Sequence, residues 1–239
     1  MRAVILAGGQ GTRLRPYTTI LPKPLLPIGD RPVLELILRQ LAGAGFTEID
    51  LCIGHLGELI TAYLGEATTM PPGLELRYHR EDRPLGTAGA VRQVRDVESD
   101  LLVMNGDIVT ALDFTAIMEF HRRERAVLTV ATTTKDVAID LGVIEQSDNV
   151  VTDYREKPHL QLAVSMGVYV YSPDALKYVP DRTFDFPDLV NALLKDGRRV
   201  VSYAFSGDWY DIGTPVEYER AITALDDADL AADLLARPS

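Results

Sequence analysis

Short apolar runs alternate with amphipathic segments through the first half of the chain, which is the pattern of strands followed by helices. The helical pattern is clearest in residues 32–42, where Pro32 suits the first turn and Asp30 is a candidate N-terminal cap. The predicted strands are Arg2–Ala7, Glu48–Ile53, Leu74–His79 and Asp100–Asn105, and the predicted helices are Pro32–Ala42, His55–Leu64 and Gly86–Val94. This alternation predicts an α/β fold with a mostly parallel sheet that is covered on both faces.

The second half of the chain is richer in strand patterns. The predicted strands are Ala126–Ala131, Gly142–Glu145, Val150–Arg155, Ala163–Tyr171 and Arg199–Ala204, and the predicted helices are Phe186–Leu194 and a segment from Pro215 to about Leu235. The sequence contains no linker, low-complexity segment or internal repeat, so we expect one domain over residues 1–239. Ligands of such sheets bind at the carboxyl ends of the strands, where the loops gather. Gly8–Arg15 and Gly106–Asp107 are both predicted to lie in loops at this edge.

One of those loops, which follows the first predicted strand, is rich in glycine and positive charge. Gly8, Gly9 and Gly11 allow backbone N–H groups to approach a ligand closely, and successive N–H groups form a concavity that binds anions. Residues 1–31 hold five basic residues against one acidic residue, whereas the whole chain carries a net charge of −11. A positive, glycine-rich loop on an acidic protein predicts a site for a phosphorylated small molecule.

The overall charge restricts the classes of partner. A pI near 4.8 argues against general binding of nucleic acid or of anionic membranes, because both need basic patches. No apolar run approaches the roughly 18 residues of a transmembrane helix, and the apolar run at the N-terminus is too short for a signal peptide. The single cysteine, Cys52, lies in an apolar run and is expected to be a buried strand residue. We therefore expect a cytoplasmic protein.

Two aspartates are candidate ligands of a metal ion. Asp107 follows the apolar run LLVMNGD, and Asp211 lies in WYDIGTP at the end of another strand. Separated carboxylates on one face suit Mg²⁺, which takes one or two protein carboxylates together with phosphate oxygens. The alternative interpretations are a turn residue for Asp107 and a helix cap for Asp211.

Two further segments could contact a ligand. Glu156 and Lys157 precede Pro158 at the end of a predicted strand, where the carboxylate could accept hydroxyl hydrogens and the ammonium could meet a phosphate. The alternative is an ordinary surface charge pair. Residues 81–90, EDRPLGTAGA, form a glycine-punctuated loop that could contact a nucleobase or simply be a tight turn.

Several familiar chemistries are not indicated. The four histidines show no metal-ligand spacing, and no serine or cysteine has the context of a nucleophile. The glycine loop lacks the third glycine of the dinucleotide-binding fingerprint, because Leu14 stands at that place, and it lacks the GK-Ser/Thr of a Walker loop. The loop therefore belongs to another class of phosphate-binding site.

The chain resembles the sugar-1-phosphate nucleotidyltransferases, also called nucleotide-sugar pyrophosphorylases. The loop GGQGTRLRPYT followed by PKPLLPI is similar to their signature. The similarity continues in the order of the family through PLGTAGA, NGD, EKP, GVYVY, FDFPDL and WYDIGTP, over residues 1 to about 220. The resemblance implies a Rossmann-like three-layer sandwich with a nucleotide-binding half (1–110), a sugar-phosphate-binding half (111–220) and a C-terminal helical tail (221–239).

The resemblance also implies a Mg²⁺-dependent reaction in which a sugar 1-phosphate attacks the α-phosphorus of a nucleoside triphosphate (NTP) and pyrophosphate leaves. Arg13, Lys23, Asp107 and Lys157 would be the catalytic residues, and Asp107 and Asp211 would hold the metal. The nucleotide would be bound by Leu6, Ala7, Gly8, Gly9, Gly11, Thr12, Arg13, Glu81, Pro84, Gly86, Thr87, Asn105 and Gly106. The sugar phosphate would be bound by Gly142, Glu156, Lys157 and Gly167.

The expected chemistry agrees with these residue types. A phosphate monoester is already an anion at neutral pH, so no general base is needed. The obstacle is bringing two anions together in line, which preorganised positive charge and orientation overcome. A site of Arg, Lys, Asp and Gly without a nucleophile is what this reaction requires.

Two departures from the family pattern bear on specificity. The chain ends at Ser239, where members with a hexapeptide-repeat domain continue, so no second acyl-transfer activity is expected. Glu81 stands about where thymidylyl- and uridylyltransferases often carry glutamine. An ionised carboxylate only accepts hydrogen bonds, and guanine offers two adjacent donors to such an acceptor. Glu81 thus favours GTP, and we expect mannose 1-phosphate or a related sugar phosphate as the second substrate.

The alternatives are a thymidylyl- or uridylyltransferase for glucose 1-phosphate and, in a different class, a catalytically silent regulatory subunit that binds nucleotide sugars. The presence of Arg13, Lys23, Asp107 and Asp211 argues against the silent subunit. The sequence identifies neither the sugar nor the oligomeric state, and homo-oligomers are frequent in the family.

Overall fold

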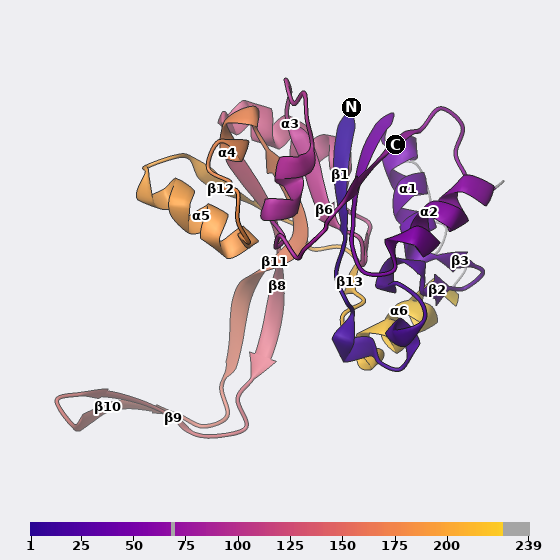
Figure 1. The fold of residues 1–239 in the computed structure, drawn as a ribbon. Coiled ribbons are helices and arrows are strands. Elements are labelled where there is room, and N and C mark those ends of the chain that lie inside the picture. Colours follow the sequence, from indigo (N-terminus) through magenta and orange to yellow (C-terminus); the bar gives the residue numbers. More distant parts are fainter. Residues whose placement is uncertain (68–69, 227–239) are drawn as a thin grey trace.

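A seven-stranded sheet forms the centre of the molecule, in the order β12-β8-β11-β6-β1-β4-β5 (Figure 1). The computed structural model describes residues 1–67 and 70–226. The strands of this sheet are β1 (Arg2–Ala7), β4 (Glu48–Ile53), β5 (Glu75–Arg80), β6 (Leu101–Asn105), β8 (Leu128–Ala138), β11 (His159–Tyr171) and β12 (Val200–Ala204). Only the two pairings made by β11 are antiparallel within this described sheet, and the other neighbours are parallel. The prediction of a mostly parallel, mixed sheet is confirmed.

Helices cover both faces of the sheet, which gives the three layers expected. The helices are α1 (Val33–Gly43), α2 (Gly57–Glu66), α3 (Phe114–Glu124), α4 (Pro173–Leu176), α5 (Phe186–Lys195) and α6 (Pro215–Asp226), with 3-10 turns η1 (Thr12–Leu14), η2 (Tyr17–Thr19), η3 (Lys23–Leu25) and η4 (Gly89–Gln93). Along β1, Ala3 and Ile5 pack in the core that α1, α2 and α3 cover. Val4 points to the opposite core, which η4, α4 and α5 cover. This alternation follows from the two-residue period of a strand.

The apolar runs of the first half become strands close to their predicted bounds. β1 and β4 coincide with the predicted ranges, whereas β5 and β6 each begin one residue later than predicted. Cys52 is fully buried on β4, as predicted, and burial raises the pKa of its thiol.

Two local predictions in the first half are wrong. Asp30 does not cap α1, because Pro32 itself occupies the N-cap position in extended backbone and no side chain caps the helix. Asp30 instead lies in the turn between the two-residue strands β2 (Pro27–Ile28) and β3 (Arg31–Pro32). The predicted helix over residues 86–94 is only the short 3-10 turn η4, because Gly86 has a φ of +81° and cannot lie in a right-handed helix.

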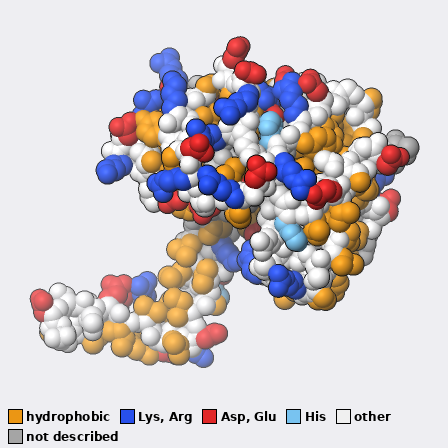
Figure 2. Space-filling view, viewed as in Figure 1, with side chains coloured by type: hydrophobic (Ala, Val, Ile, Leu, Met, Phe, Trp, Pro, Cys, Tyr) orange, Lys and Arg blue, Asp and Glu red, His pale blue; other side chains and the backbone are white. Residues whose placement is uncertain are grey.

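The second half contains a projecting arm, and the sequence patterns predict its two strands but not its projection from the sheet. β8 and β11 are longer than predicted and run beyond the sheet. They lead into the hairpin of β9 (Val143–Ser147) and β10 (Val150–Arg155), which projects away from the core (Figure 1). We call residues 139–158 the arm. Hydrophobic side chains lie along its surface (Figure 2), and they include Leu141, Ile144, Val150, Val151 and Tyr154.

The remaining elements complete the fold around the sheet. Helix α3 is not among the predicted elements, although Phe114, Ile117, Met118 and His121 recur at helical spacing and are buried. The strands β7 (Ile108–Thr110) and β13 (Trp209–Asp211) form a short antiparallel pair. Helix α6 begins at Pro215 as predicted, and the predicted continuation toward Leu235 lies outside the described residues.

No helix in residues 1–67 and 70–226 is both long enough and apolar enough to cross a membrane. The division of the chain into two functional halves near residue 110 stays a prediction.

Candidate active site

The glycine loop follows β1 and has a conformation that residues with a Cβ could not adopt at Gly8 and Gly11. Gly11 has a φ of +60°, and a Cβ there would lie 2.8 Å from Thr18 Cγ2. The Thr18 hydroxyl donates to the Gly11 carbonyl at 2.7 Å and fixes the loop against η2. At Gly8, a Cβ would overlap the Glu81 carboxylate. The loop therefore needs glycine both for its backbone conformation and for its close contacts.

Lys23, Asp107 and Asp211 come together at the end of this loop. The Lys23 ammonium forms an ion pair with Asp107 and lies 4.0 Å from Asp211 Oδ1. Two backbone contacts hold Asp107 in place. The N–H of Gly106 donates to the Leu6 carbonyl at 2.9 Å, and the N–H of Ile212 donates to the Asp107 carbonyl at 3.1 Å. The prediction that the loop after β1 and the loop after β6 share one edge of the sheet is confirmed.

The two carboxylates differ in their surroundings. Oδ1 of Asp107 is buried and has no hydrogen-bond partner among the described residues. The pKa of Asp211 is raised, first because the carboxyl is partly desolvated and then because Asp107 adds a second negative charge. The charges of Lys23 and Arg13 oppose this rise without cancelling it. The cluster thus holds two carboxylates close together with incomplete neutralisation.

Arg13 lies beside the same cluster. A Cβ added to Gly213 would lie 3.1 Å from Arg13 Nη2 and 3.0 Å from Asp211 Oδ1, so the two side chains flank this glycine. No ion pair involves Arg13 within the part of the chain that the structure describes. Its guanidinium is therefore free to meet an anion.

A pocket of about 400 Å³ extends from Asp107 along the glycine loop. Its lining residues are Leu6, Gly8, Gly9, Gln10, Glu81, Pro84, Gly86, Thr87, Ala90, Asn105, Asp107 and Asp185. Most of them are residues predicted to bind the nucleotide. Gln10, Ala90 and Asp185 are additions that the sequence reasoning missed.

Glu81 lines the pocket next to Gly8 of the glycine loop. Its Oε2 accepts the N–H of Leu85 at 2.9 Å, and its other oxygen faces Gly8. Burial raises the pKa of this carboxyl, and the hydrogen bond from Leu85 opposes that rise. One carboxylate oxygen thus fixes the loop, and the other faces the glycine loop.

Residues 84–89 are held by hydrogen bonds to the segment that precedes α5. The N–H of Phe184 donates to the Leu85 carbonyl at 2.8 Å, and the N–H of Thr87 donates to Asp185 Oδ1 at 3.0 Å. A Cβ on Gly86 would lie 2.7 Å from the Phe184 carbonyl oxygen. The sequence analysis assigns no role to Asp185 itself. Its position directly before a helix that has Pro in its first turn is the pattern of an N-cap, and this pattern could have identified it.

Gly167 joins the same region from β11. Its φ is +74°, and a Cβ there would lie 2.7 Å from Asn105 Nδ2. The indole N–H of Trp209 on β13 donates to the neighbouring Met166 carbonyl at 2.9 Å. The backbone of Gly167 therefore lies next to the residues that lead into Asp107.

Three predicted sugar-phosphate residues lie apart from this cluster. Gly142, Glu156 and Lys157 are exposed on the arm, and none of them lines the pocket. Glu156 accepts the hydroxyl of Tyr154 at 2.6 Å, and Lys157 has a φ of +43°. The structure brings Gly167 to the site but not the other three, whose roles stay predictions.

Comparison with known proteins agrees with this arrangement. The family model described as "Nucleotidyl transferase" matches residues 2–228. The chain is 31% identical to a UTP–glucose-1-phosphate uridylyltransferase of Synechocystis, with 93% of the chain aligned. It is 30% identical to a mannose-1-phosphate guanyltransferase of Candida albicans, with 91% of the chain aligned. The chain spans 62% of the length of each of these relatives.

Solved structures share the fold over almost the whole chain. A Bacillus anthracis protein assigned as a glucose-1-phosphate thymidylyltransferase, solved with a sucrose, is 26% identical and superposes with a TM-score of 0.74 over 95% of this chain and 96% of that one. HddC from Yersinia pseudotuberculosis is 25% identical, with a TM-score of 0.72 over 93% of this chain and 98% of that one. The predicted resemblance is confirmed, and the chain belongs to the nucleotidyl transferase family.

Proposed function

We propose that this protein transfers a nucleoside monophosphate from an NTP to a sugar 1-phosphate. The observation that carries the proposal is the convergence of Lys23, Asp107 and Asp211 at one end of the glycine-loop pocket. The names of relatives with about 30% identity support the reaction class, since they are uridylyl- and guanylyltransferases of sugar 1-phosphates.

In the proposed reaction, an oxygen of the sugar phosphate attacks the α-phosphorus, and the bond from that phosphorus to the bridging oxygen of the β-phosphate breaks. Pyrophosphate carries away the electron pair of the broken bond. The attacking oxygen is already ionised at neutral pH, so no side chain has to remove a proton. The backbone N–H groups of the glycine loop orient the triphosphate, and Arg13 and Lys23 offset its negative charge. The leaving pyrophosphate is held by the guanidinium of Arg13.

The residues present fit a divalent cation such as Mg²⁺. Among the described residues, no group of three or more His, Cys, Asp or Glu side chains is arranged to hold a metal ion. Mg²⁺, however, usually takes only one or two protein carboxylates and completes its shell with phosphate oxygens and water. Asp107 offers a buried, unpartnered Oδ1, and Asp211 offers a second carboxylate beside it. When bound there, the ion would offset phosphate charge and orient the triphosphate.

Glu81 supports GTP as the nucleotide. One of its oxygens accepts the N–H of Leu85, and the other lies beside Gly8, which lines the same pocket. In the proposal, this second oxygen accepts a hydrogen bond from the bound base. Guanine offers adjacent N–H donors to an acceptor, whereas uracil and thymine offer one donor between two carbonyl groups. Mannose 1-phosphate is the corresponding sugar, since a guanyltransferase for it is among the relatives. Glucose 1-phosphate with UTP or dTTP is the alternative, which the Synechocystis relative supports.

The arm completes the proposed sugar site. Glu156 and Lys157 lie on it, so their predicted contacts with the sugar hydroxyls and the sugar phosphate require the arm to bend toward the edge of the sheet. Every residue of β10 is exposed, so the hairpin at the tip of the arm packs against no other described element that would oppose such bending.

The test is pyrophosphate release with Mg²⁺ over a grid of NTPs against sugar 1-phosphates. We expect one strong combination, and GTP with mannose 1-phosphate is the first candidate. Higher kcat/KM with UTP or dTTP would overturn the choice of base. If the protein binds nucleotide but shows no turnover in either direction, the proposed enzymatic activity is overturned in favour of a catalytically silent subunit.

Asp107→Asn tests the residue assignment within the active protein. We expect kcat to fall at least about a hundredfold, as for loss of an electrostatic group at a reacting centre, with a nearly unchanged melting temperature. Asp30→Asn is the matched control, because Asp30 is exposed in the β2–β3 turn, where it pairs with Arg31 and not with any residue of the cluster. Unfolding of the Asp107 variant would instead support the interpretation of Asp107 as a turn residue.

A further inference from the structure

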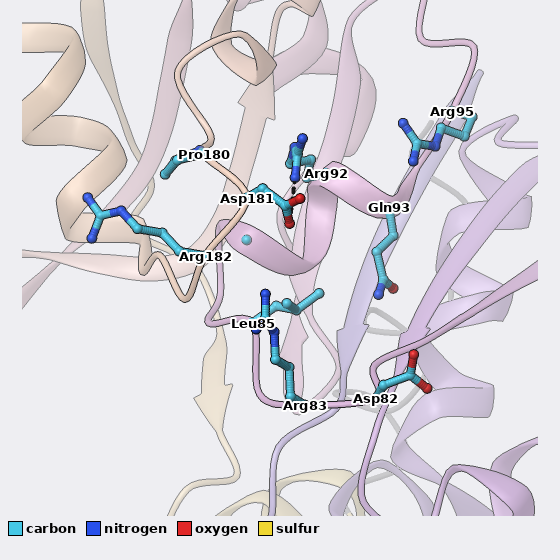
Figure 3. A pocket seen from close by; sticks show the side chains of 10 residues that line it. Asp82, Arg83, Leu85, Arg92, Gln93, Arg95, Pro180, Asp181 and Arg182 are labelled. Carbon is cyan, nitrogen blue, oxygen red and sulfur yellow. Dashed lines mark ion pairs between the residues drawn. The ribbon is translucent and has the colours of Figure 1, made fainter.

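A second pocket, of about 410 Å³, lies behind the loop that borders the nucleotide pocket (Figure 3). Glu81, Pro84, Gly86 and Thr87 line the nucleotide pocket, whereas the intervening Asp82, Arg83 and Leu85 line the second one. The same segment of chain therefore forms a wall of both pockets.

Four arginines surround the second pocket. Arg83 comes from the loop, Arg92 and Arg95 from η4 and the residues after it, and Arg182 from the segment before α5 (Figure 3). We call these four side chains the arginine cluster. On a chain with a net charge of −11, this is a local reversal of charge.

Most of this positive charge is not neutralised by the protein. Arg92 pairs with Asp181 at 2.8 Å. No ion pair within the part of the chain that the structure describes involves Arg83, Arg95 or Arg182. Arg182 instead lies over the Phe184 ring, 5.6 Å from its centroid. Of the two aspartates in the lining, only Asp181 is engaged with an arginine.

A polar acceptor also lines this pocket without a partner. Gln93 donates from Nε2 to the Arg80 carbonyl at 3.1 Å, and this bond fixes its amide. Its Oε1 is buried and has no hydrogen-bond partner among the described residues.

We propose that the arginine cluster binds a small anion that carries more than one phosphate group. Guanidinium groups bind phosphate oxygens through paired N–H donors, and their planar shape suits them to this role more than lysine. The unpaired guanidiniums are spread around the pocket rather than gathered at one point (Figure 3). This spacing favours a ligand with separated phosphates over a single inorganic phosphate.

Occupation of this pocket changes nucleotide affinity through the shared wall. Thr183 Oγ1 donates to the Pro84 carbonyl at 2.9 Å, so the loop and the segment before α5 move together. That segment also contributes to both pockets, with Asp181 and Arg182 in one and Asp185 in the other. By linkage, a nucleotide in the first pocket then changes the affinity of the second for its anion by the same factor.

Inorganic tripolyphosphate is the probe, and calorimetric titration of the full chain without added metal is the measurement. We compare the wild-type protein with the triple variant R83Q/R95Q/R182Q, whose altered side chains are exposed. We expect a binding event in the wild type that the triple variant weakens at least tenfold. Arg13→Gln removes the guanidinium beside the cluster of Lys23, Asp107 and Asp211, and this variant should still bind tripolyphosphate at the arginine cluster.

A charge-matched control separates a specific pocket from general attraction of anions. The triple variant R122Q/R123Q/R125Q changes the net charge equally, at the end of α3. If both triple variants weaken binding equally, or if only Arg13→Gln abolishes it, the proposal is overturned. Absence of any binding to the wild type overturns it as well.

The coupling has its own readout. With the nucleotide pocket saturated by GTP and no sugar phosphate present, we expect the Kd of tripolyphosphate at the arginine cluster to change at least threefold. An unchanged Kd would overturn the coupling. None of these measurements needs turnover, so failure of the proposed enzyme activity would leave the test of the arginine cluster intact.

Discussion

Gly86 offers a sharp test of how the loop of the nucleotide pocket is held. Its φ is +81°, and a Cβ there would lie 2.7 Å from the Phe184 carbonyl oxygen. That oxygen already accepts the N–H groups of Ala88 and Gly89, at 3.1 and 2.8 Å, so it cannot move away freely. Gly86→Ala therefore combines an unfavourable backbone conformation with a steric clash.

Gly73 is a matched control for the backbone part of this cost. Its φ is +84°, and nothing lies within 4 Å of the Cβ position. The left-handed conformation costs about 1–2 kcal/mol for a residue with a Cβ, in both variants. The clash at Gly86 adds about 1–3 kcal/mol, typical of inserting an atom where the structure is closely packed. Alanine also reduces the entropy of the unfolded chain, and this effect is common to both sites.

Urea unfolding followed by the fluorescence of the single tryptophan, Trp209, measures both free energies of unfolding. We expect Gly86→Ala to lose about 2–5 kcal/mol and Gly73→Ala to lose about 1–2 kcal/mol, the sums of the costs above. The KM for the NTP should rise only for Gly86→Ala, because Gly86 and Thr87 line the pocket. Equal losses of stability in the two variants would refute the reasoning about the Phe184 carbonyl.

Three further predictions concern the charged side chains. Burial and the charge of Asp107 raise the pKa of Asp211, so the folded state loses stability as pH rises from the unfolded pKa toward the raised one. Asp211→Asn should therefore be inactive yet more stable than the wild type at pH 7. A gain in stability over the wild type that is as large at pH 4 as at pH 7 would contradict this. Glu81→Gln introduces an amide donor, so we expect the ratio of kcat/KM for GTP to that for UTP to fall about tenfold, or 1.4 kcal/mol; an unchanged ratio would remove Glu81 from base recognition. Lys157→Ala should raise the KM for the sugar 1-phosphate about tenfold with an unchanged KM for the NTP, whereas the exposed Lys195→Ala should change neither; identical kinetics of the two lysine variants would remove the arm from the sugar site.

The central strands could be predicted from the sequence because each signal is local. The apolar runs at β1 and β4 are bounded by glycine or polar residues, and their bounds agree with the structure. The two strands of the arm could also be predicted, because β10 has its predicted bounds and β9 overlaps its predicted range. The projection of the arm could not be predicted, because its apolar side chains lie exposed and no sequence pattern indicates that β8 and β11 continue beyond the sheet. The conformation of Gly86, likewise, depends on a segment almost a hundred residues away.

The candidate site was predictable to a different extent in each of its parts. The rule for parallel strands placed Gly8–Arg15 and Gly106–Asp107 at the same edge of the sheet, and the family resemblance added Lys23. The structure pairs Lys23 with Asp107. Asp185 was missed because its role depends on meeting Thr87 in space, which no sequence spacing reveals. The positions of Glu156 and Lys157 relative to the pocket depend on the direction of the arm, which follows from neither periodicity nor charge.

The cluster of Lys23, Asp107 and Asp211 also departs from what stability alone would favour. Asp107 and Asp211 are held near one another by the β7–β13 pair, and the single ammonium of Lys23 contacts one carboxylate and lies 4.0 Å from the other. An unpartnered buried Oδ1 and a raised carboxyl pKa both oppose folding. Neutral residues of similar size would pack there at lower cost, and this cost is explained by the ligand-binding role proposed for the cluster. The gain in stability expected for Asp211→Asn is thus a direct measure of what the site costs the fold.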